Sequence, residues 1–327
     1  MRFLVTGGAG FIGSHLVERL VAAGQDVVIL DDLSSGRREN FAAVRRRVSF
    51  IRGSVTDLRM CRRAVDGADY VLHQAALTSV QRSVDEPLAA HEVNATGTLN
   101  ILLAARDARV RRVVYAGSTS AYGNAATLPN SEDHVTRPLS PYAASKLAGE
   151  EYCSAFHASY GLETVVLRYF NVFGPRQDPN SPYAAVAPRF IAAALRGEPP
   201  TIYGDGRQTR DFVYVGNVVH ANLLAARAPA THVAGHVFNI GCGQSVSIID
   251  LWDRIQGLAG VPVLPKYAEG RPGEVRNSLA SIDKARELMG YQPIVDFDEG
   301  LRQTVSYHRE SRKQRRRRRP RAVVQAA

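Results

Sequence analysis

Tyr142 and Lys146 are the residues whose types and spacing most directly suggest chemistry, because they lie four positions apart in Ser140–Lys146. On a helix, this spacing places both side chains on one face. A free tyrosine, with a pKa of about 10, is a poor base at neutral pH, but a nearby ammonium group favours its phenolate. An oxidised nicotinamide would add a second positive charge. Such a pair can remove a hydroxyl proton as a hydride leaves the same carbon.

A serine cluster at 118–120 supports this interpretation. A Tyr and a Lys at this spacing also occur together on ordinary protein surfaces, so the pair needs independent support. Ser118, Thr119 and Ser120 follow an expected strand at 112–116. In a doubly wound sheet, ligands bind at the carboxyl ends of the strands. The cluster therefore favours a catalytic site.

The segment Thr6–Gly13 indicates a dinucleotide site. Gly7, Gly10 and Gly13 follow an expected strand at 3–6 and open an expected helix at 13–23. Glycines allow a tight turn and a close approach to a pyrophosphate, and the helix N-terminus supplies unpaired N–H groups with a partial positive charge.

Asp31 ends the second expected strand, at 26–30. There its carboxylate could accept both ribose hydroxyls of NAD and repel the additional phosphate of NADP. Arg37 and Arg38 follow closely and could accommodate that phosphate, so NAD is favoured without being settled. Asp57 could bind the adenine amino group or act as a helix N-cap.

The elements that must position these residues alternate along the first half of the chain. This order predicts an α/β fold with a doubly wound parallel (Rossmann) sheet. After Asn171, closely spaced prolines predict a smaller, interleaved lobe. We expect a nucleotide-binding domain at 1–174 with a returning strand near 237–240, a mainly substrate-binding lobe at 175–308 and a basic, disordered tail at 309–327. The expected strands are 3–6, 26–30, 48–51, 70–73, 112–116 and 164–168, and the expected helices include 13–23, 88–108 and 142–160.

The charge of the 327-residue chain, +10, is concentrated in its last residues. Between Arg309 and Arg321 there are nine basic residues and one acidic residue, which leaves the body nearly neutral. Arg315–Arg319 could contact a nucleic acid or an anionic lipid. A solvated extension is favoured, so we expect turnover to survive the removal of 309–327.

The three cysteines, Cys61, Cys153 and Cys242, are too scattered for a disulfide framework or a zinc site, and no metal is expected. No leader-type segment or membrane-length apolar run is evident. These features favour a cytoplasmic protein without a membrane partner.

The motifs together resemble those of the extended short-chain dehydrogenases/reductases, and within them the nucleotide-sugar 4-epimerases. The resemblance covers about residues 1–308, and 171–180 looks particularly like the group active on N-acetylhexosamines. The motifs are Thr6–Gly13, Asp31–Gly36, His73–Ala76, Asn94–Thr98, Ser118–Ser120 before Tyr122, Tyr142 with Lys146, and Arg168–Gly174.

The resemblance implies a bound NAD, a UDP-sugar substrate and a homodimer that pairs the helices near 88–108 and 142–160. Ser118 would hydrogen-bond the sugar 4-hydroxyl, Tyr142 would be the acid/base, and Lys146 would bind the nicotinamide ribose and lower the pKa of the tyrosine. The implied cofactor-binding residues are Gly7, Gly10, Phe11, Ile12, Gly13, Asp31, Asp32, Ser35, Gly36, Asp57, Leu58, Ala75, Ala76, Asn94, Tyr142, Lys146 and Tyr169.

By the same resemblance, Arg210 and Arg271 would clamp the diphosphate, as suits two guanidinium forks. Glu274 stands where the family often has Asp, and Asn217 replaces another common Asp while remaining a good N-cap before Val218. The implied substrate-binding residues are Ser118, Thr119, Tyr142, Asn171, Tyr203, Arg210, Arg271, Glu274 and Ser278.

Thr119 and Ser120 separate the possible reactions. Dehydrating relatives resemble Thr-Asp-Glu here, and decarboxylating relatives usually carry Glu where Ser120 stands, so both branches are disfavoured, although they and a reductase stay as alternatives. Ser278 aligns with a position where an aromatic residue restricts some epimerases to non-acetylated sugars, so we expect both sugar classes to be accepted. A non-catalytic nucleotide-binding module with a nucleic-acid-binding tail is the alternative from another class.

Overall fold

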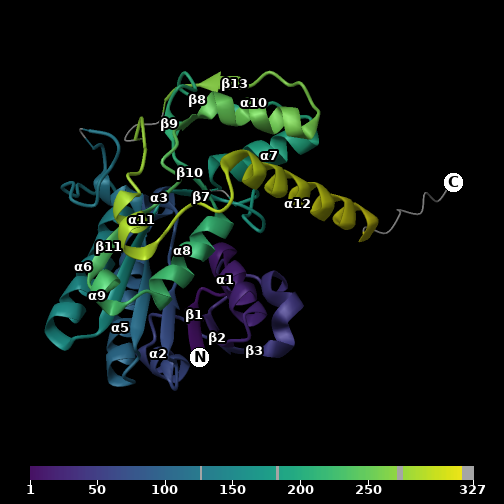
Figure 1. The fold of residues 1–327 in the computed structure, drawn as a ribbon. Helices are drawn as coiled ribbons and strands as arrows, with labels where there is room; N and C mark the ends of the chain where they lie inside the picture. Colours follow the sequence, from purple (N-terminus) through teal and green to yellow (C-terminus); the bar gives the residue numbers. More distant parts are fainter. Residues whose placement is uncertain (126, 182–183, 271–274, 319–327) are drawn as a thin grey trace.

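The fold is built on a seven-stranded, wholly parallel sheet with the order β11-β6-β5-β4-β1-β2-β3 (Figure 1). The computed structural model describes residues 1–125, 127–181, 184–270 and 275–318. The sheet strands are β1 (Arg2–Thr6), β2 (Asp26–Asp31), β3 (Val48–Arg52), β4 (Tyr70–His73), β5 (Arg112–Ser118), β6 (Glu163–Tyr169) and β11 (His236–Ile240).

Helices cover both faces of this sheet, and alternate residues of a strand point into two separate apolar cores. Phe3 and Val5 pack on one side with α1 (Phe11–Ala22), α8 (Val215–Arg227) and α11 (Asp283–Met289). Leu4 packs on the other side with α2 (Leu58–Val65), α5 (Gly97–Asp107) and α6 (Pro141–Tyr160). Strands buried on both faces are typical of parallel sheets. The doubly wound fold predicted from the sequence is confirmed.

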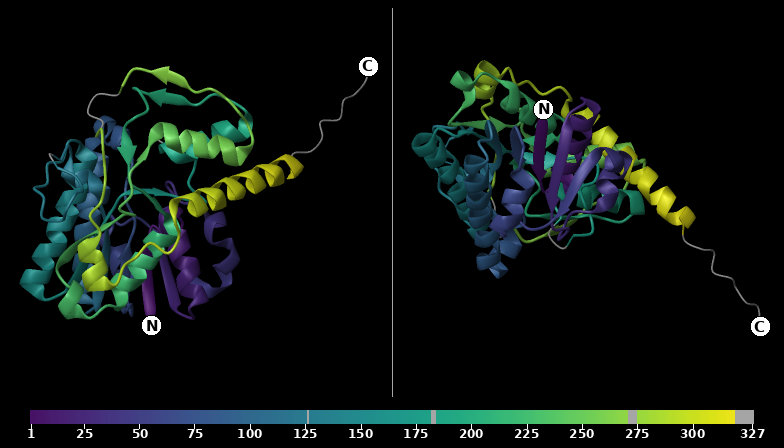
Figure 2. Two further views of the ribbon diagram at one scale, coloured as in Figure 1. Left: turned by 45° about the horizontal axis from the view of Figure 1, so that its top comes forward. Right: turned by 90° about the horizontal axis from the view of Figure 1, so that it is seen from below.

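Above the carboxyl ends of the strands lies a smaller lobe with its own apolar core around Phe190, Trp252 and Phe297 (Figures 1 and 2). Its strands are β7 (Asn171–Phe173), β8 (Thr201–Tyr203), β9 (Thr209–Arg210), β10 (Phe212–Tyr214), β12 (Val246–Ser247) and β13 (Lys266–Ala268), and its main helices are α7 (Val186–Arg196), α10 (Ile248–Ala259) and α12 (Phe297–Arg318). The short elements of the chain are the 3-10 helices η1 (Arg38–Arg47) and η3 (Thr119–Tyr122) with α3 (Val80–Asp85), α4 (Pro87–His91) and α9 (Ala230–Val233).

The helix expected at 88–108 contains a wider turn. A π-helical segment, η2 (Glu92–Thr96), joins α4 to α5. The residues at its two ends, His91 and Gly97, have α-helical backbone angles, so the helix continues without a break. The sequence pattern did not reveal this turn, because π segments insert one residue into an otherwise regular helix.

Two local expectations need correction. Asn217 is not the N-cap of α8, since it lies inside the first turn and its side chain bonds the backbone of Ile294 and Val295. The boundary placed at residue 308 falls inside α12, which continues to Arg318. The end of α12 projects away from the sheet in Figure 2, and residues 319–327 lie outside the described part of the chain.

Among the described residues, no helix combines the length and the apolar character needed to cross a membrane.

Candidate active site

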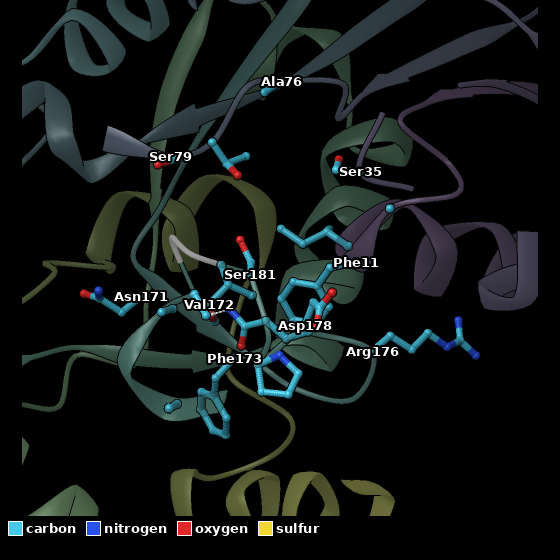
Figure 3. Close-up of a pocket in the computed structure, with 18 of the residues that line it drawn as sticks. Phe11, Ser35, Ala76, Ser79, Asn171, Val172, Phe173, Arg176, Asp178 and Ser181 are labelled. Carbon is cyan, nitrogen blue, oxygen red and sulfur yellow. Dashed lines mark hydrogen bonds between the residues drawn. The ribbon is translucent and has the colours of Figure 1, made fainter. Parts of the chain in front are cut away.

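A cavity of about 1450 Å³ lies between the carboxyl ends of the strands and the smaller lobe (Figure 3). It brings together residues from both halves of the chain, including the Tyr142 and Lys146 pair. Of the predicted site residues, those that line it are Gly7, Gly10, Phe11, Ile12, Gly13, Asp31, Asp32, Ser35, Ala75, Ala76, Ser118, Thr119, Tyr142, Lys146, Tyr169, Asn171, Tyr203 and Arg210.

Several predicted site residues are placed elsewhere. Asp57 accepts a hydrogen bond from Arg59 N and so caps α2, as the N-cap interpretation of this residue predicted. Leu58 is the first residue of that helix. Gly36, Asn94 and Ser278 are also absent from the cavity wall. Arg271 and Glu274 lie outside the described residues.

The glycine loop is shaped by contacts that leave no room for side chains. A Cβ at Gly13 would lie 2.1 Å from the carbonyl oxygen of Gly7, and one at Gly7, whose φ is +65°, would lie 2.8 Å from Ala75 N. Gly10 is the N-cap of α1 and provides no side-chain cap. The first turn of α1 therefore faces the cavity with its backbone, which suits the pyrophosphate of a dinucleotide.

Asp31 is held at the edge of this loop. Its carboxylate is 7% exposed and accepts hydrogen bonds from Ala9 N at 2.9 Å and Leu33 N at 2.8 Å. Burial raises the pKa of Asp31, and these two hydrogen bonds oppose the rise. The carboxylate is thus fixed at the carboxyl end of β2, where a ribose diol would be accepted.

Asn94 connects the cofactor region with α6 instead of lining the cavity. Its side chain accepts from Leu77 N at 2.8 Å and donates to Leu77 O and to Ser145 Oγ, both at 3.0 Å. Four residues later, Thr98 Oγ1 lies 3.1 Å from His73 Nε2, and His73 Nδ1 lies 2.6 Å from Thr6 Oγ1. Burial lowers the pKa of His73 to about 3, so its ring is neutral.

Ser118 and Tyr142 meet where β5 ends beside the start of α6. Ser140 caps α6 by accepting from Ala143 N at 3.1 Å, and Ser83 Oγ accepts from Tyr142 N at 2.9 Å, which fixes the first turn. Burial raises the pKa of Tyr142, while a hydrogen bond with Ser118 lowers it. Ser118 Oγ also accepts from Ser120 Oγ at 2.8 Å.

Lys146 is only 4% exposed, and its ammonium group lies 4.3 Å from the centre of the Tyr115 ring. The Tyr115 hydroxyl donates to the carbonyl oxygen of Lys146 at 3.0 Å, so one tyrosine holds both ends of this residue. Burial lowers the pKa of Lys146 to about 7, against the opposing effects of Cys153 and Glu150. An anionic partner that enters the cavity, such as a phenolate, would therefore stabilise the protonated form of this buried amine strongly.

Arg210 lines the cavity, whereas its neighbour Asp211 is not part of the cavity wall. Arg210 Nη1 donates to Thr209 O at 2.8 Å and to Arg276 O at 3.0 Å, which orients its guanidinium. Asp211 is fully buried and accepts from the backbone N–H groups of Cys242, Gly243 and Ala280 at 2.8 to 3.1 Å. Burial raises the pKa of Asp211 to about 6 despite these bonds.

Sequence reasoning missed Asp211, although it directly follows Arg210, because no local pattern shows which distant N–H groups it accepts from. The loop after β7 was also missed as part of the cavity wall, where Gln177, Asp178, Asn180 and Ser181 lie. Figure 3 shows Asp178 and Ser181 around the same space as Phe11 of α1. The only signal for this loop is its place in the 171–180 motif.

The chain is similar to proteins of known chemistry over nearly its whole length. Residues 3–241 match the NAD dependent epimerase/dehydratase family. A UDP-glucose 4-epimerase from Mycolicibacterium smegmatis is 42% identical, with coverage of 94% of this chain and 99% of the relative.

Solved structures agree with this similarity. A UDP-N-acetylglucosamine 4-epimerase from Methanobrevibacter ruminantium in complex with UDP-N-acetylmuramic acid has a TM-score of 0.90 at 41% identity, covering 95% of this chain and 98% of that one. A UDP-glucose 4-epimerase from Thermus thermophilus in complex with NAD has a TM-score of 0.85 at 40% identity, covering 94% and 99%.

Proposed function

The chain belongs to the NAD-dependent epimerase/dehydratase family, and from this premise we propose that it inverts carbon 4 of a UDP-hexose. The observation that carries the proposal is the meeting of Ser118, Tyr142 and Lys146 in one cavity with the glycine loop of α1. This combination places a proton-transfer group beside a dinucleotide-binding backbone. A module that only binds nucleotide does not need all three side chains.

The residues around the glycine loop fit NAD. The loop admits no side chain at Gly7 or Gly13, and the fixed Asp31 carboxylate would accept the hydroxyl groups of the adenosine ribose. When bound, NAD supplies a reversible hydride acceptor. Lys146 would hold the nicotinamide ribose from the floor of the cavity.

Tyr142 acts as the base in this proposal. Its phenolate takes the proton of the 4-hydroxyl while Ser118 Oγ hydrogen-bonds the same oxygen. Tyr142 returns the proton after the keto sugar has rotated. Burial raises the pKa of Tyr142. The positive charge of Lys146, together with the charge of oxidised nicotinamide, would offset this rise.

The UDP group must stay anchored while the keto sugar rotates. Arg210, Asn171 and Tyr203 all line the cavity. In this proposal Arg210 and Asn171 hold the diphosphate, and Tyr203 lies against the uracil ring. Arg271 and Glu274 complete the proposed set from outside the described residues. Fixed anchors at one end of the substrate permit rotation at the other without release.

Dehydration and decarboxylation are disfavoured by the residues beside Ser118. Thr119 and Ser120 carry no carboxylate, and the Ser120 hydroxyl already donates to Ser118 Oγ at 2.8 Å. Elimination of water from the keto sugar needs an additional acid and base at this position. The serine cluster supports a return of hydride instead.

Ser278 is proposed to set the range of sugars. It is 5% exposed, its N–H donates to Thr209 O at 3.2 Å, and its Oγ is buried with no hydrogen-bond partner among the described residues. Ser278 is not itself part of the cavity wall, and in this proposal its small side chain leaves volume into which the wall can yield for an N-acetyl group. Ser278→Tyr should depress turnover of acetylated substrates selectively and Ser278→Ala should not; an equal loss for both sugar classes would contradict the assignment.

Incubation with UDP-glucose, UDP-galactose and their two N-acetyl counterparts, followed by proton NMR, tests the reaction. We expect inversion at carbon 4 without net formation of NADH. Loss of water, or loss of carbon dioxide from a UDP-uronic acid added in a separate incubation, would assign the protein to a sister reaction. No conversion of any of the four sugars would refute the proposal.

A homodimer through the helices near 88–108 and 142–160 also remains part of the proposal. Leu88 is 79% exposed and Tyr152 of α6 is 39% exposed, so apolar side chains are available on this side. Light scattering on purified protein should give twice the chain mass, and Leu88→Glu should reduce it to one.

A further inference from the structure

Arg37 is the arginine that bears on the choice between NAD and NADP. Its backbone N–H donates to Ala9 O at 2.9 Å, and Ala9 N in turn donates to Asp31 Oδ2 at 2.9 Å. The backbone of Ala9 therefore connects Arg37 to the Asp31 carboxylate, which is proposed to accept the ribose diol. It lines the cavity, so its guanidinium could reach a phosphate on the ribose 2′-oxygen.

Arg38 is directed elsewhere. Its guanidinium lies 4.9 Å from the centre of the Phe50 ring, and this ring is stacked on Phe41 of η1. The residue is not part of the cavity wall. Of this pair, only Arg37 therefore lines the cavity.

The Arg37 guanidinium forms an ion pair with Asp178, which lies 141 residues later in the loop after β7. Asp178 Oδ1 accepts from Asn180 N at 2.9 Å, so its own loop orients the carboxylate. Two contacts place that loop on α1. Arg176 pairs with Glu18 at 2.6 Å, and His15 Nε2 donates to Pro175 O at 3.0 Å.

We propose that Asp178 is a determinant of cofactor choice, because its ion pair occupies Arg37 at the adenosine-ribose end of the cavity. A 2′-phosphate there would face the carboxylates of Asp31 and Asp32 without the charge of Arg37 to balance it. The inference rests on the proposed function, since it assumes a bound dinucleotide. Both side chains are partly exposed, at 51% and 35%, so the effect is moderate in size.

The test is a competition between the two nucleotides. Purified wild type, Asp178→Asn and Asp178→Asn/Arg37→Gln are each brought to equilibrium with equal excesses of NAD and NADP, desalted, and their bound nucleotides are released by acid and quantified by chromatography. Asp178→Asn should raise the bound NADP:NAD ratio about threefold to fivefold. The double variant should return it to the wild-type value, and 0.5 M salt should shrink the gain.

Glu18→Gln is the matched control, because it breaks the second ion pair of the same loop without touching Arg37. It should leave the NADP:NAD ratio unchanged. The inference is overturned if Asp178→Asn does not change the ratio, if the gain persists in the double variant, or if Glu18→Gln gives the same gain. Wild type that binds neither nucleotide would refute the proposed function itself.

Discussion

The two ends of the cavity are built in different ways. The cofactor end is centred on one short stretch, Gly7 to Arg37, and its glycine loop is defined by backbone atoms that exclude side chains. The substrate end combines Ser118, Asn171, Tyr203 and Arg210 from four separate elements, and it is defined by charged and polar side chains. A change in the glycine loop should therefore act through shape, whereas a change at the substrate end should act through charge and hydrogen bonding.

Tyr142 lies where the two ends meet, and its removal should have the largest effect. Tyr142→Phe deletes the proposed base while it keeps the ring, so we expect kcat to fall about a thousandfold. Bound NAD, measured after acid release, should not change. Tyr152→Phe, on the exposed side of the same helix, is the control and should keep full activity. A Tyr142→Phe protein with more than a tenth of wild-type kcat would exclude the proposed role.

Gly13→Ala tests whether backbone shape defines the cofactor end. Its Cβ would lie 2.1 Å from Gly7 O, so the loop must shift, and we expect the affinity for NAD to fall about a hundredfold. Calorimetric titration with NAD measures this change. Gly257→Ala meets no atom within 4 Å and should bind NAD like the wild type. Retained NAD affinity in Gly13→Ala would show that the loop is more adaptable than its contacts indicate.

Arg210→Met tests the substrate end. Loss of a charged donor to the diphosphate should raise KM for the UDP-sugar about thirtyfold, with bound NAD unchanged. Arg210→Lys should recover only part of the loss, because an ammonium group cannot form the same bidentate contact. The exposed Arg207→Met variant serves as the comparison in steady-state kinetics. If Arg210→Met released NAD as well, the two ends would not be independent.

Lys146 should give the smallest effect, through the pH dependence of stability in nucleotide-free protein. Burial lowers the pKa of Lys146 to about 7 from its ordinary value of 10.5. Between these values the unfolded chain holds a proton that the folded chain has lost, so the free energy of unfolding rises with pH. Relative to Lys146→Met, the wild type should gain about 1 kcal/mol per pH unit. Urea unfolding at pH 7.5 and 8.5 measures it, and parallel curves for the two proteins would contradict the lowered pKa.

The same contrast between the two ends decides how much could be predicted from the sequence. The sheet and the glycine loop were predictable, since periodicity and the spacing of Gly7, Gly10 and Gly13 are local signals. The family and its cofactor were identified by motifs of the same local kind. The pairing of Arg37 with Asp178 was not predictable, because nothing in either segment indicates the other.

Contacts between residues that lie far apart in the sequence could not be predicted, for the same reason. Asn217 was expected to cap a helix, but in the folded chain it bonds the backbone near residue 295. The hydrogen bonds by which Asn94 joins Leu77 to Ser145 were not indicated by the sequence either. In both cases the partners are brought near only by tertiary packing.

The π turn at Glu92–Thr96 holds one residue more than a regular helix needs between α4 and α5. The wider turn absorbs this residue locally, so Asn94 reaches Leu77 while Thr98 still contacts His73 and the apolar side chains of Ile101 and Leu102 stay in the core. Deleting one residue here would let the segment close into a regular α-helix without turning α5. The cost of such a deletion should therefore fall on the hydrogen bonds of Asn94 and not on the packing of α5.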